Sequence, residues 1–164
     1  ILHETRMLDV DSVAHRYEHS LEVQLPFLQY LYGNNFKIVP ICFLMQDYDS
    51  AVEIGRALTE ALDATNTVVI ASSDMTHYES EKSASLKDQA ALKEVAALNA
   101  KGFYDTIEAK NITACGYAPI TALITYVVGV CAKAELLAYH TSGDITGDHS
   151  SVVGYAAASF KKRV

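Results

Sequence analysis

The chain has 164 residues, of which half are apolar and a fifth are charged, and its formal net charge is −7. This length and composition are typical of one folded domain that forms its hydrophobic core without disulfides or structural metal ions. Lys and Arg cluster only at residues 161–163, which disfavours nucleic-acid binding, and no apolar run is long enough to span a membrane.

The first predicted element is a helix from Ser20 to about Tyr32, which Pro26 would kink or split and Gly33 would end. The elements predicted after it are, in chain order, a strand at 36–43, an amphipathic helix from 49 or 50 to 62, a strand at 67–71, an amphipathic helix at 83–100 with Leu86, Ala90, Val95 and Leu98 inward, a short helix at 103–109, a long helix that begins at 115–116, and strands at 135–141 and 151–160. This alternation predicts one α/β domain over residues 1–164, with three layers in the order α/β/α.

The loop after the strand at 67–71 carries the strongest functional signal. There the apolar run TVVIA changes abruptly into SSDMTH, which would place Asp74 and His77 at the carboxyl edge of a sheet. Open α/β sheets bind their ligands at that edge. His77 would exchange protons near neutral pH, and Asp74 would orient it or hold a substrate hydroxyl. The alternative is that the serines and Asp74 simply cap a helix.

Two further residues are candidate metal ligands. Cys115 stands at the start of a predicted helix, where a thiolate would serve as a nucleophile or a ligand. The alternative is a small buried filler, which suits Cys42 and Cys131 better because both lie in apolar runs. His19 also lies near a helix start, and it is either a ligand or a surface or packing residue.

Three other observations narrow the possibilities. The three cysteines are widely spaced and form no C-x-x-C pair or disulfide framework, which favours a reducing cytoplasm. The loop SGDITGDHS would place Asp144, Asp148 and His149 either at a pocket mouth or in a solvated turn. The sequence has no G-x-S-x-G, H-E-x-x-H, Walker or G-x-G-x-x-G motif, so the common hydrolase, kinase and dinucleotide-binding functions lose support.

Four segments in register resemble one protein family. EHSLEVQLPFL, VIASSDMTHY, ITACGYAPITAL and YHTSGDITGDHSSVVGYAA together resemble the Memo family, whose bacterial and archaeal members are called AmmeMemoRadiSam system protein B. The resemblance covers about residues 15–160. It implies a three-layer α/β/α fold with a mixed sheet, similar to that of class III extradiol dioxygenases.

The same resemblance implies a set of site residues. It makes His19 and Cys115 metal ligands, and it places Asp74 and His77 in the same pocket, with His77 in the acid/base position. A ligand set that contains a thiol suits iron or copper, with zinc as the alternative. The family's P-H-A-G-Y motif, which carries another metal histidine, is not in this sequence. We therefore expect the chain to be the C-terminal part of a longer protein.

Three functional hypotheses follow. The leading one is a cytoplasmic Memo-like metal-binding protein with a dioxygenase-like pocket, acting as a redox enzyme on an unidentified small molecule, beside a radical-SAM protein. The second is a non-catalytic module that recognises a peptide or partner in the same pocket. The third is a cysteine hydrolase with Cys115 as nucleophile and His77 as base. An exposed sheet edge would favour a homo-oligomer, and no nucleic-acid or membrane partner is expected.

Overall fold

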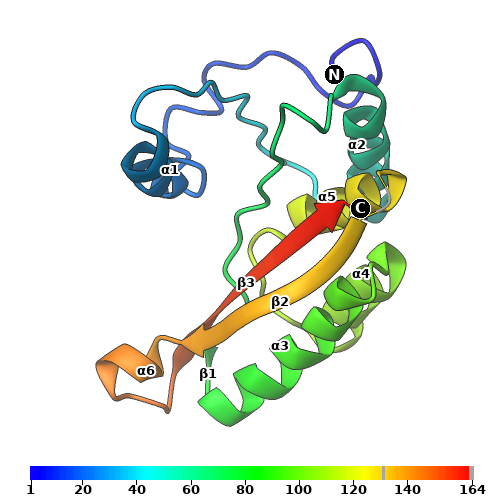
Figure 1. Ribbon diagram of the computed structural model, residues 1–164. Coiled ribbons are helices and arrows are strands. Elements are labelled where there is room, and N and C mark those ends of the chain that lie inside the picture. The colour runs from blue at the N-terminus through cyan, green and yellow to red at the C-terminus, as the bar shows by residue number, and fades with distance from the viewer. Residues whose placement is uncertain (131, 163–164) are drawn as a thin grey trace.

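The structure is a computed structural model that describes residues 1–130 and 132–162 (Figure 1). Cys131, expected to be a buried filler, lies outside the described residues. The elements are, in chain order, η1 (Glu22–Gln24), α1 (Leu25–Tyr32), α2 (Tyr48–Ala61), β1 (His77–Glu79), α3 (Glu81–Ala96), α4 (Ala100–Ala109), α5 (Tyr117–Gly129), β2 (Ala132–Thr141), α6 (Gly143–Thr146) and β3 (Val152–Lys162).

The sheet is a long hairpin with one short strand added to it. Strands β2 and β3 pair antiparallel, and β1 pairs antiparallel with the other edge of β3, giving the order β1-β3-β2. His77 lies opposite Val153, whereas Glu79 lies opposite Val152, so β1 contains an irregularity at Tyr78. The pairing places the start of β1, and with it the end of the 72–77 loop, beside the first residues of β3.

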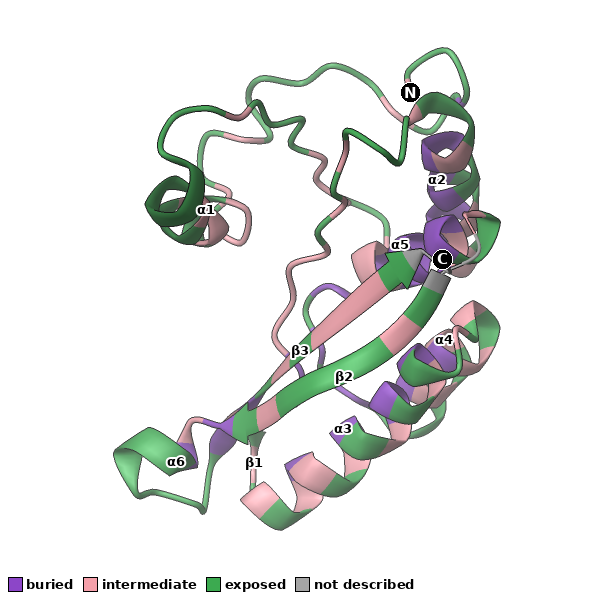
Figure 2. Cartoon of the chain, in the orientation of Figure 1, coloured by how far each residue is buried: buried purple, intermediate pink, exposed green. Residues whose placement is uncertain are grey.

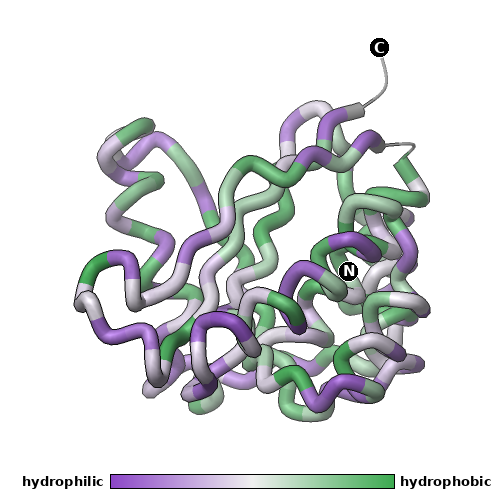
Figure 3. The backbone as a smooth tube through the Cα atoms, turned by 90° about the horizontal axis from the view of Figure 1, so that it is seen from below, coloured by the Kyte–Doolittle hydropathy of each residue, from purple (hydrophilic) through white to green (hydrophobic). Residues whose placement is uncertain are grey.

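The core lies between the helices and one face of the hairpin. Alternate residues of β3 face inward, because side chains alternate across a strand. Figure 2 shows buried residues concentrated in the helices, and Figure 3 shows hydrophilic and hydrophobic stretches interleaved along the coiled parts of the backbone. The main cluster contains Met75, Ala91, Leu92, Val95, Phe103, Ile107, Ile112, Ala114 and Ile124, packed against Tyr139, Ala156, Ala158 and Phe160.

Helix α2 belongs to a second cluster. Its side chains Ile54 and Leu58 pack against Ala122, Leu123, Tyr126 and Val127 of α5. Gly55 allows this close approach, because a Cβ there would meet the carbonyl oxygen of Ala122 at 2.5 Å. Helix α5 therefore contributes to both clusters, because its Ile124 belongs to the main one.

The predicted α/β class is confirmed, and most of the helices and both hairpin strands lie where the sequence predicts them. Pro26 falls in the first turn of α1 and Gly33 ends it with φ 60. In the described part of the chain the pairings are antiparallel and helices cover one face of the hairpin, while Tyr155 on the other face is exposed.

The strands predicted at 36–43 and 67–71 are wrong for the described residues, where both segments are irregular. Val39 and Val68 are largely exposed, Val68 to 84%. Other apolar side chains of the two segments are half-buried against the second cluster, namely Ile41, Phe43, Val69 and Ala71. A strand is stabilised by a hydrogen-bonded neighbour and by packing on its faces, and neither segment has such a neighbour here. The inward position predicted for Leu86 is also wrong, because this side chain is 67% exposed.

None of the helices in the described part of the chain combines the length and the apolar character that a membrane crossing requires.

Candidate metal centre

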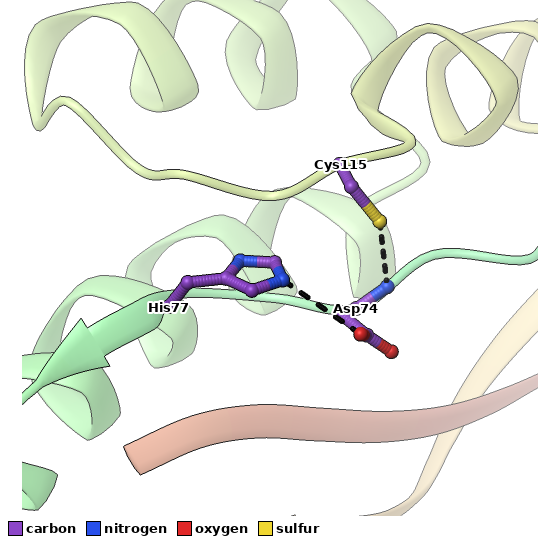
Figure 4. Close-up of side chains that lie close together, drawn as sticks. All are labelled: Asp74, His77 and Cys115. Carbon is purple, nitrogen blue, oxygen red and sulfur yellow. Dashed lines mark hydrogen bonds and ion pairs between the residues drawn. The ribbon is translucent and has the colours of Figure 1, made fainter. Parts of the chain in front are cut away.

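Three of the predicted site residues meet in space. Asp74, His77 and Cys115 each offer one ligand atom, and these atoms lie within 4.8 Å of one another (Figure 4). Asp74 and His77 come from the 72–77 loop and the start of β1, whereas Cys115 directly precedes Gly116, the N-cap of α5. His77 Nε2 lies 3.7 Å from Asp74 Oδ2. We call these three residues the Asp74–His77–Cys115 cluster.

Thr113 fixes the orientation and the tautomer of His77. Its hydroxyl oxygen accepts a hydrogen bond from the His77 backbone N–H at 2.7 Å, and its carbonyl oxygen lies 2.8 Å from the ring Nδ1. A carbonyl oxygen only accepts hydrogen bonds, so Nδ1 carries the proton. In the neutral ring, Nε2 then presents its lone pair to Asp74. Metal-binding histidines are held in the same way by an acceptor on their other nitrogen.

The two segments that form the cluster approach each other closely. The Asp74 N–H donates to Cys115 Sγ at 3.2 Å, and the Gly116 N–H donates to Ser73 Oγ at 2.8 Å. A Cβ on Gly116 would lie 2.8 Å from both the carbonyl oxygen of Ser72 and the Cβ of Ser73. The contact between the two segments therefore requires glycine at position 116.

The Gln46 side chain hydrogen-bonds the backbone at the start of α5. Its Nε2 donates to the carbonyl oxygen of Cys115 at 2.9 Å, and its Oε1 accepts from the Ala118 N–H at 3.2 Å. The first N–H groups of a helix lack partners within the helix, and Gly116 has no side chain with which to supply one. Gln46 takes over this role from the segment before α2, and it fixes the backbone that carries Cys115.

The cluster is accessible to solvent. The Asp74 side chain is 48% exposed and that of His77 is 22% exposed, and Cys115 is exposed. Water or a small ligand can therefore complete the coordination of an ion bound there. Two surface hollows of about 200 and 410 Å³ have other linings, one at α1 and one between α2 and α5.

His19 is the predicted ligand that does not join this cluster. Its side chain is exposed, although its neighbours reach the same loop: the Ser20 carbonyl oxygen accepts from Ser72 Oγ at 2.8 Å, and Gln24 Nε2 donates to Ser72 Oγ at 3.0 Å. The segment EHSLEVQ thus lies beside the cluster while the imidazole lies outside it.

Other predicted polar residues have structural partners. Cys42 Sγ lies 3.2 Å from a ring nitrogen of His15, and burial, reinforced by the charge of Glu18, raises the pKa of the Cys42 thiol. In the hairpin turn, Asp144 accepts from His140 at 2.9 Å. That bond holds the pKa of the Asp144 carboxyl below its ordinary value. For this turn the structure supports the solvated alternative rather than a pocket mouth.

No motif in the sequence indicates the roles of Thr113, Gln46 and Ser73. Each acts through the fold on a residue distant in the chain, so no local spacing signals it. A sequence signal does exist for Asp88, a polar residue at an inward position of α3, on the same side as Leu92 and Val95.

Comparison with known proteins identifies the family. A family model described as Memo-like protein matches residues 1–159. The chain belongs to the Memo family. A MEMO1 family protein of Methanocaldococcus jannaschii is 50% identical over 158 residues, which cover 93% of this chain and 55% of the relative. Another, from Methanopyrus kandleri, is 46% identical over 159 residues, covering 95% and 56%.

A third relative, from Sulfolobus acidocaldarius, is 44% identical over 158 residues, again covering 95% of this chain and 56% of the relative. The chain thus spans a little over half the length of these Memo-family relatives. The resemblance inferred from the four sequence segments is confirmed over nearly the whole chain.

Proposed function

We propose that this Memo-family chain binds one divalent transition-metal ion through Asp74, His77 and Cys115. The observation that carries the proposal is the geometry of His77: with Nδ1 bound to the Thr113 carbonyl, the lone pair of Nε2 faces Asp74 Oδ2 at 3.7 Å. Two acceptors that face each other repel unless a cation or a proton lies between them. Two ligands of a tetrahedral metal, with bonds of about 2.1 Å, are roughly 3.4 Å apart.

The donor set indicates which metals fit. A thiolate and a carboxylate together neutralise the charge of a divalent ion, and the imidazole adds a neutral nitrogen. Mixed sulfur, nitrogen and oxygen ligands suit iron, copper or zinc, whereas magnesium and calcium prefer oxygen alone. We propose iron or copper, with zinc as the alternative. His19 is the proposed fourth ligand. Its imidazole lies outside the cluster in this structure and would have to turn toward the ion, while Ser20 and Gln24 of the same segment already contact Ser72.

The proposed activity is redox chemistry on a small molecule, for which the bound metal would supply Lewis-acid and electron-transfer capacity. Because the cluster is exposed, a substrate can reach the coordination sphere directly. A second arrangement leaves the metal to Cys115 and His19 and frees His77 for acid/base work. Nε2 would then take a proton from a substrate hydroxyl, and Asp74 would stabilise the imidazolium.

Metal analysis of purified variants tests the proposal. His77→Ala and Cys115→Ala each remove one ligand, and His140→Ala and Cys42→Ala are matched controls with the same residue types outside the cluster. We expect the first two to lose at least tenfold in metal affinity and the controls to keep the wild-type value. Unchanged metal content in both site variants contradicts the proposal. Loss in Cys115→Ala alone assigns His77 the acid/base role.

The openness of the cluster also supports a second candidate function, a non-catalytic module that recognises a peptide or partner. Peptide binding that persists after chelation and in Cys115→Ala would favour the module. Binding that requires the metal would favour the first proposal.

A further inference from the structure

Asp88 is a fully buried carboxylate in the middle of α3. Its Oδ1 accepts from the Thr76 backbone N–H at 3.1 Å and from Thr76 Oγ1 at 2.6 Å, and its Oδ2 accepts from the Tyr139 hydroxyl at 2.8 Å. Burial, together with the hydrogen bond to Asp88, raises the pKa of Tyr139, so the tyrosine keeps its proton and donates it.

A carboxylate at this position is costly. Burying a charge without an opposite charge costs free energy, and a well-packed apolar residue is often more stabilising in its place. Within the described residues, Asp88 forms no ion pair with Lys, Arg or His. Its three hydrogen bonds lead to one loop residue and one strand, and these contacts indicate what the carboxylate does.

Thr76 stands between the two cluster residues of the loop. Its segment is also held by β3, because the Met75 N–H donates to the Gly154 carbonyl and the Gly154 N–H donates to the Thr76 carbonyl, both at 2.9 Å. Gly154 makes room for the carboxylate, since a Cβ there would overlap Asp88 Oδ2. Helix α3 and strand β3 therefore both hold Thr76, and β3 also holds Met75.

The backbone N–H groups at the start of β1 donate their hydrogen bonds to side chains. Thr76 N–H is bound by Asp88, and His77 N–H is bound by the Thr113 hydroxyl. Two consecutive backbone donors are thus satisfied by side chains, so the backbone path between Asp74 and His77 follows from where those side chains stand. Ligand groups need placement to within a fraction of an ångström, so movement of Thr76 would separate the ligand atoms.

We propose that Asp88 is a positioning residue for the Asp74–His77–Cys115 cluster: its carboxylate anchors Thr76 so that Asp74 and His77 both face Cys115. The inference rests on the proposed metal-binding function for its first test and is independent of that function for its second. Asp88 does not itself contact the ion. Its role resembles that of the outer groups that orient ligands in metal sites.

The first test is Co²⁺ binding by Asp88→Ala, Asp88→Asn and Val95→Ala. We expect Asp88→Ala to weaken Co²⁺ binding about tenfold or more. Asp88→Asn should restore binding to within about threefold, because its amide oxygen accepts from Thr76 and its amide nitrogen donates to the tyrosine oxygen. Val95→Ala removes buried volume from the same helix and should leave affinity unchanged. Wild-type affinity in Asp88→Ala overturns the inference.

A milder variant covers the case in which Asp88→Ala does not fold. Thr76→Val deletes the hydroxyl bond to Asp88 and keeps the backbone bond. It should weaken Co²⁺ binding about threefold or more, while Val95→Ala again stays at the wild-type value. Equal affinity in wild type and Thr76→Val overturns the inference.

The second test needs no metal. Amide hydrogen exchange of Asp74 and His77 is measured in the metal-free proteins and compared with core amides of α5. Asp88→Ala, or Thr76→Val in its place, should accelerate exchange at these two amides relative to the core, whereas Val95→Ala should not. If wild type binds no Co²⁺, the proposed function fails, and this measurement still decides on Asp88. Equal acceleration in Asp88→Ala and Val95→Ala overturns the inference.

Discussion

Replacement of Gly116 by alanine should damage both the stability of the protein and its metal site. The added Cβ would lie 2.8 Å from the Ser72 carbonyl oxygen and from the Ser73 Cβ, and 3.0 Å from Ser73 Oγ. Since carbon atoms pack at about 3.5–4.0 Å, the two segments must separate by roughly half an ångström or more. Overpacking of this kind costs about 1–3 kcal/mol, and weakening the Gly116–Ser73 hydrogen bond costs about 1 kcal/mol.

We therefore expect Gly116→Ala to lower the free energy of unfolding by about 2–3 kcal/mol and metal affinity by about tenfold. Urea denaturation and Co²⁺ titration measure the two effects. Gly129→Ala, at the other end of α5, is the control: its Cβ would meet the Thr59 side chain at 2.7 Å, away from the cluster. It should lose stability and keep its affinity. Wild-type metal affinity in Gly116→Ala would refute the close approach as the basis of the site.

Three further predictions concern residues around the loop. Tyr78 has φ 58, a left-handed conformation that glycine adopts without strain, so Tyr78→Gly should raise the free energy of unfolding by up to about 1 kcal/mol in urea denaturation. The Lys87 hydrogen bond lowers the pKa of Glu79 below its ordinary value, so this carboxylate stabilises the protein above the pKa of an unfolded glutamate and loses its effect as the pH falls through its folded pKa. Glu79→Gln should therefore show a smaller loss of thermal stability on acidification. Tyr139→Phe removes a donor to the buried Asp88 carboxylate and should lower the free energy of unfolding by about 1–3 kcal/mol.

The opposite results would each contradict a specific step. A less stable Tyr78→Gly would mean that the aromatic ring contributes more than the backbone conformation costs. An acid profile of Glu79→Gln identical to that of wild type would remove Glu79 from the pH dependence. A Tyr139→Phe variant as stable as wild type would show that the remaining bonds satisfy the carboxylate.

Sequence patterns predicted the helices well, because periodic apolar residues and helix start and end signals such as Pro26 and Gly33 are local properties of the chain. The hairpin strands were predicted for the same reason. The segments 36–43 and 67–71 have the composition of strands, but a strand also needs a partner, and the described structure offers them none. Local composition could not reveal that difference.

The candidate site shows a similar division. Asp74, His77 and Cys115 were predicted from their motifs, and the fold brings them together. Thr113, Gln46 and Asp88 act only through contacts between distant segments, so their roles required the structure. Only Asp88 has a local signal, because an aspartate on the inward face of an amphipathic helix needs hydrogen-bond partners.

The most direct test of the central claim is X-ray absorption spectroscopy of the Zn²⁺-loaded protein. We predict one sulfur ligand at about 2.3 Å and nitrogen or oxygen ligands at about 2.0–2.2 Å, with the sulfur absent from Cys115→Ala and retained in Cys42→Ala. A spectrum without sulfur, or one that Cys115→Ala leaves unchanged, would contradict shared coordination by the cluster.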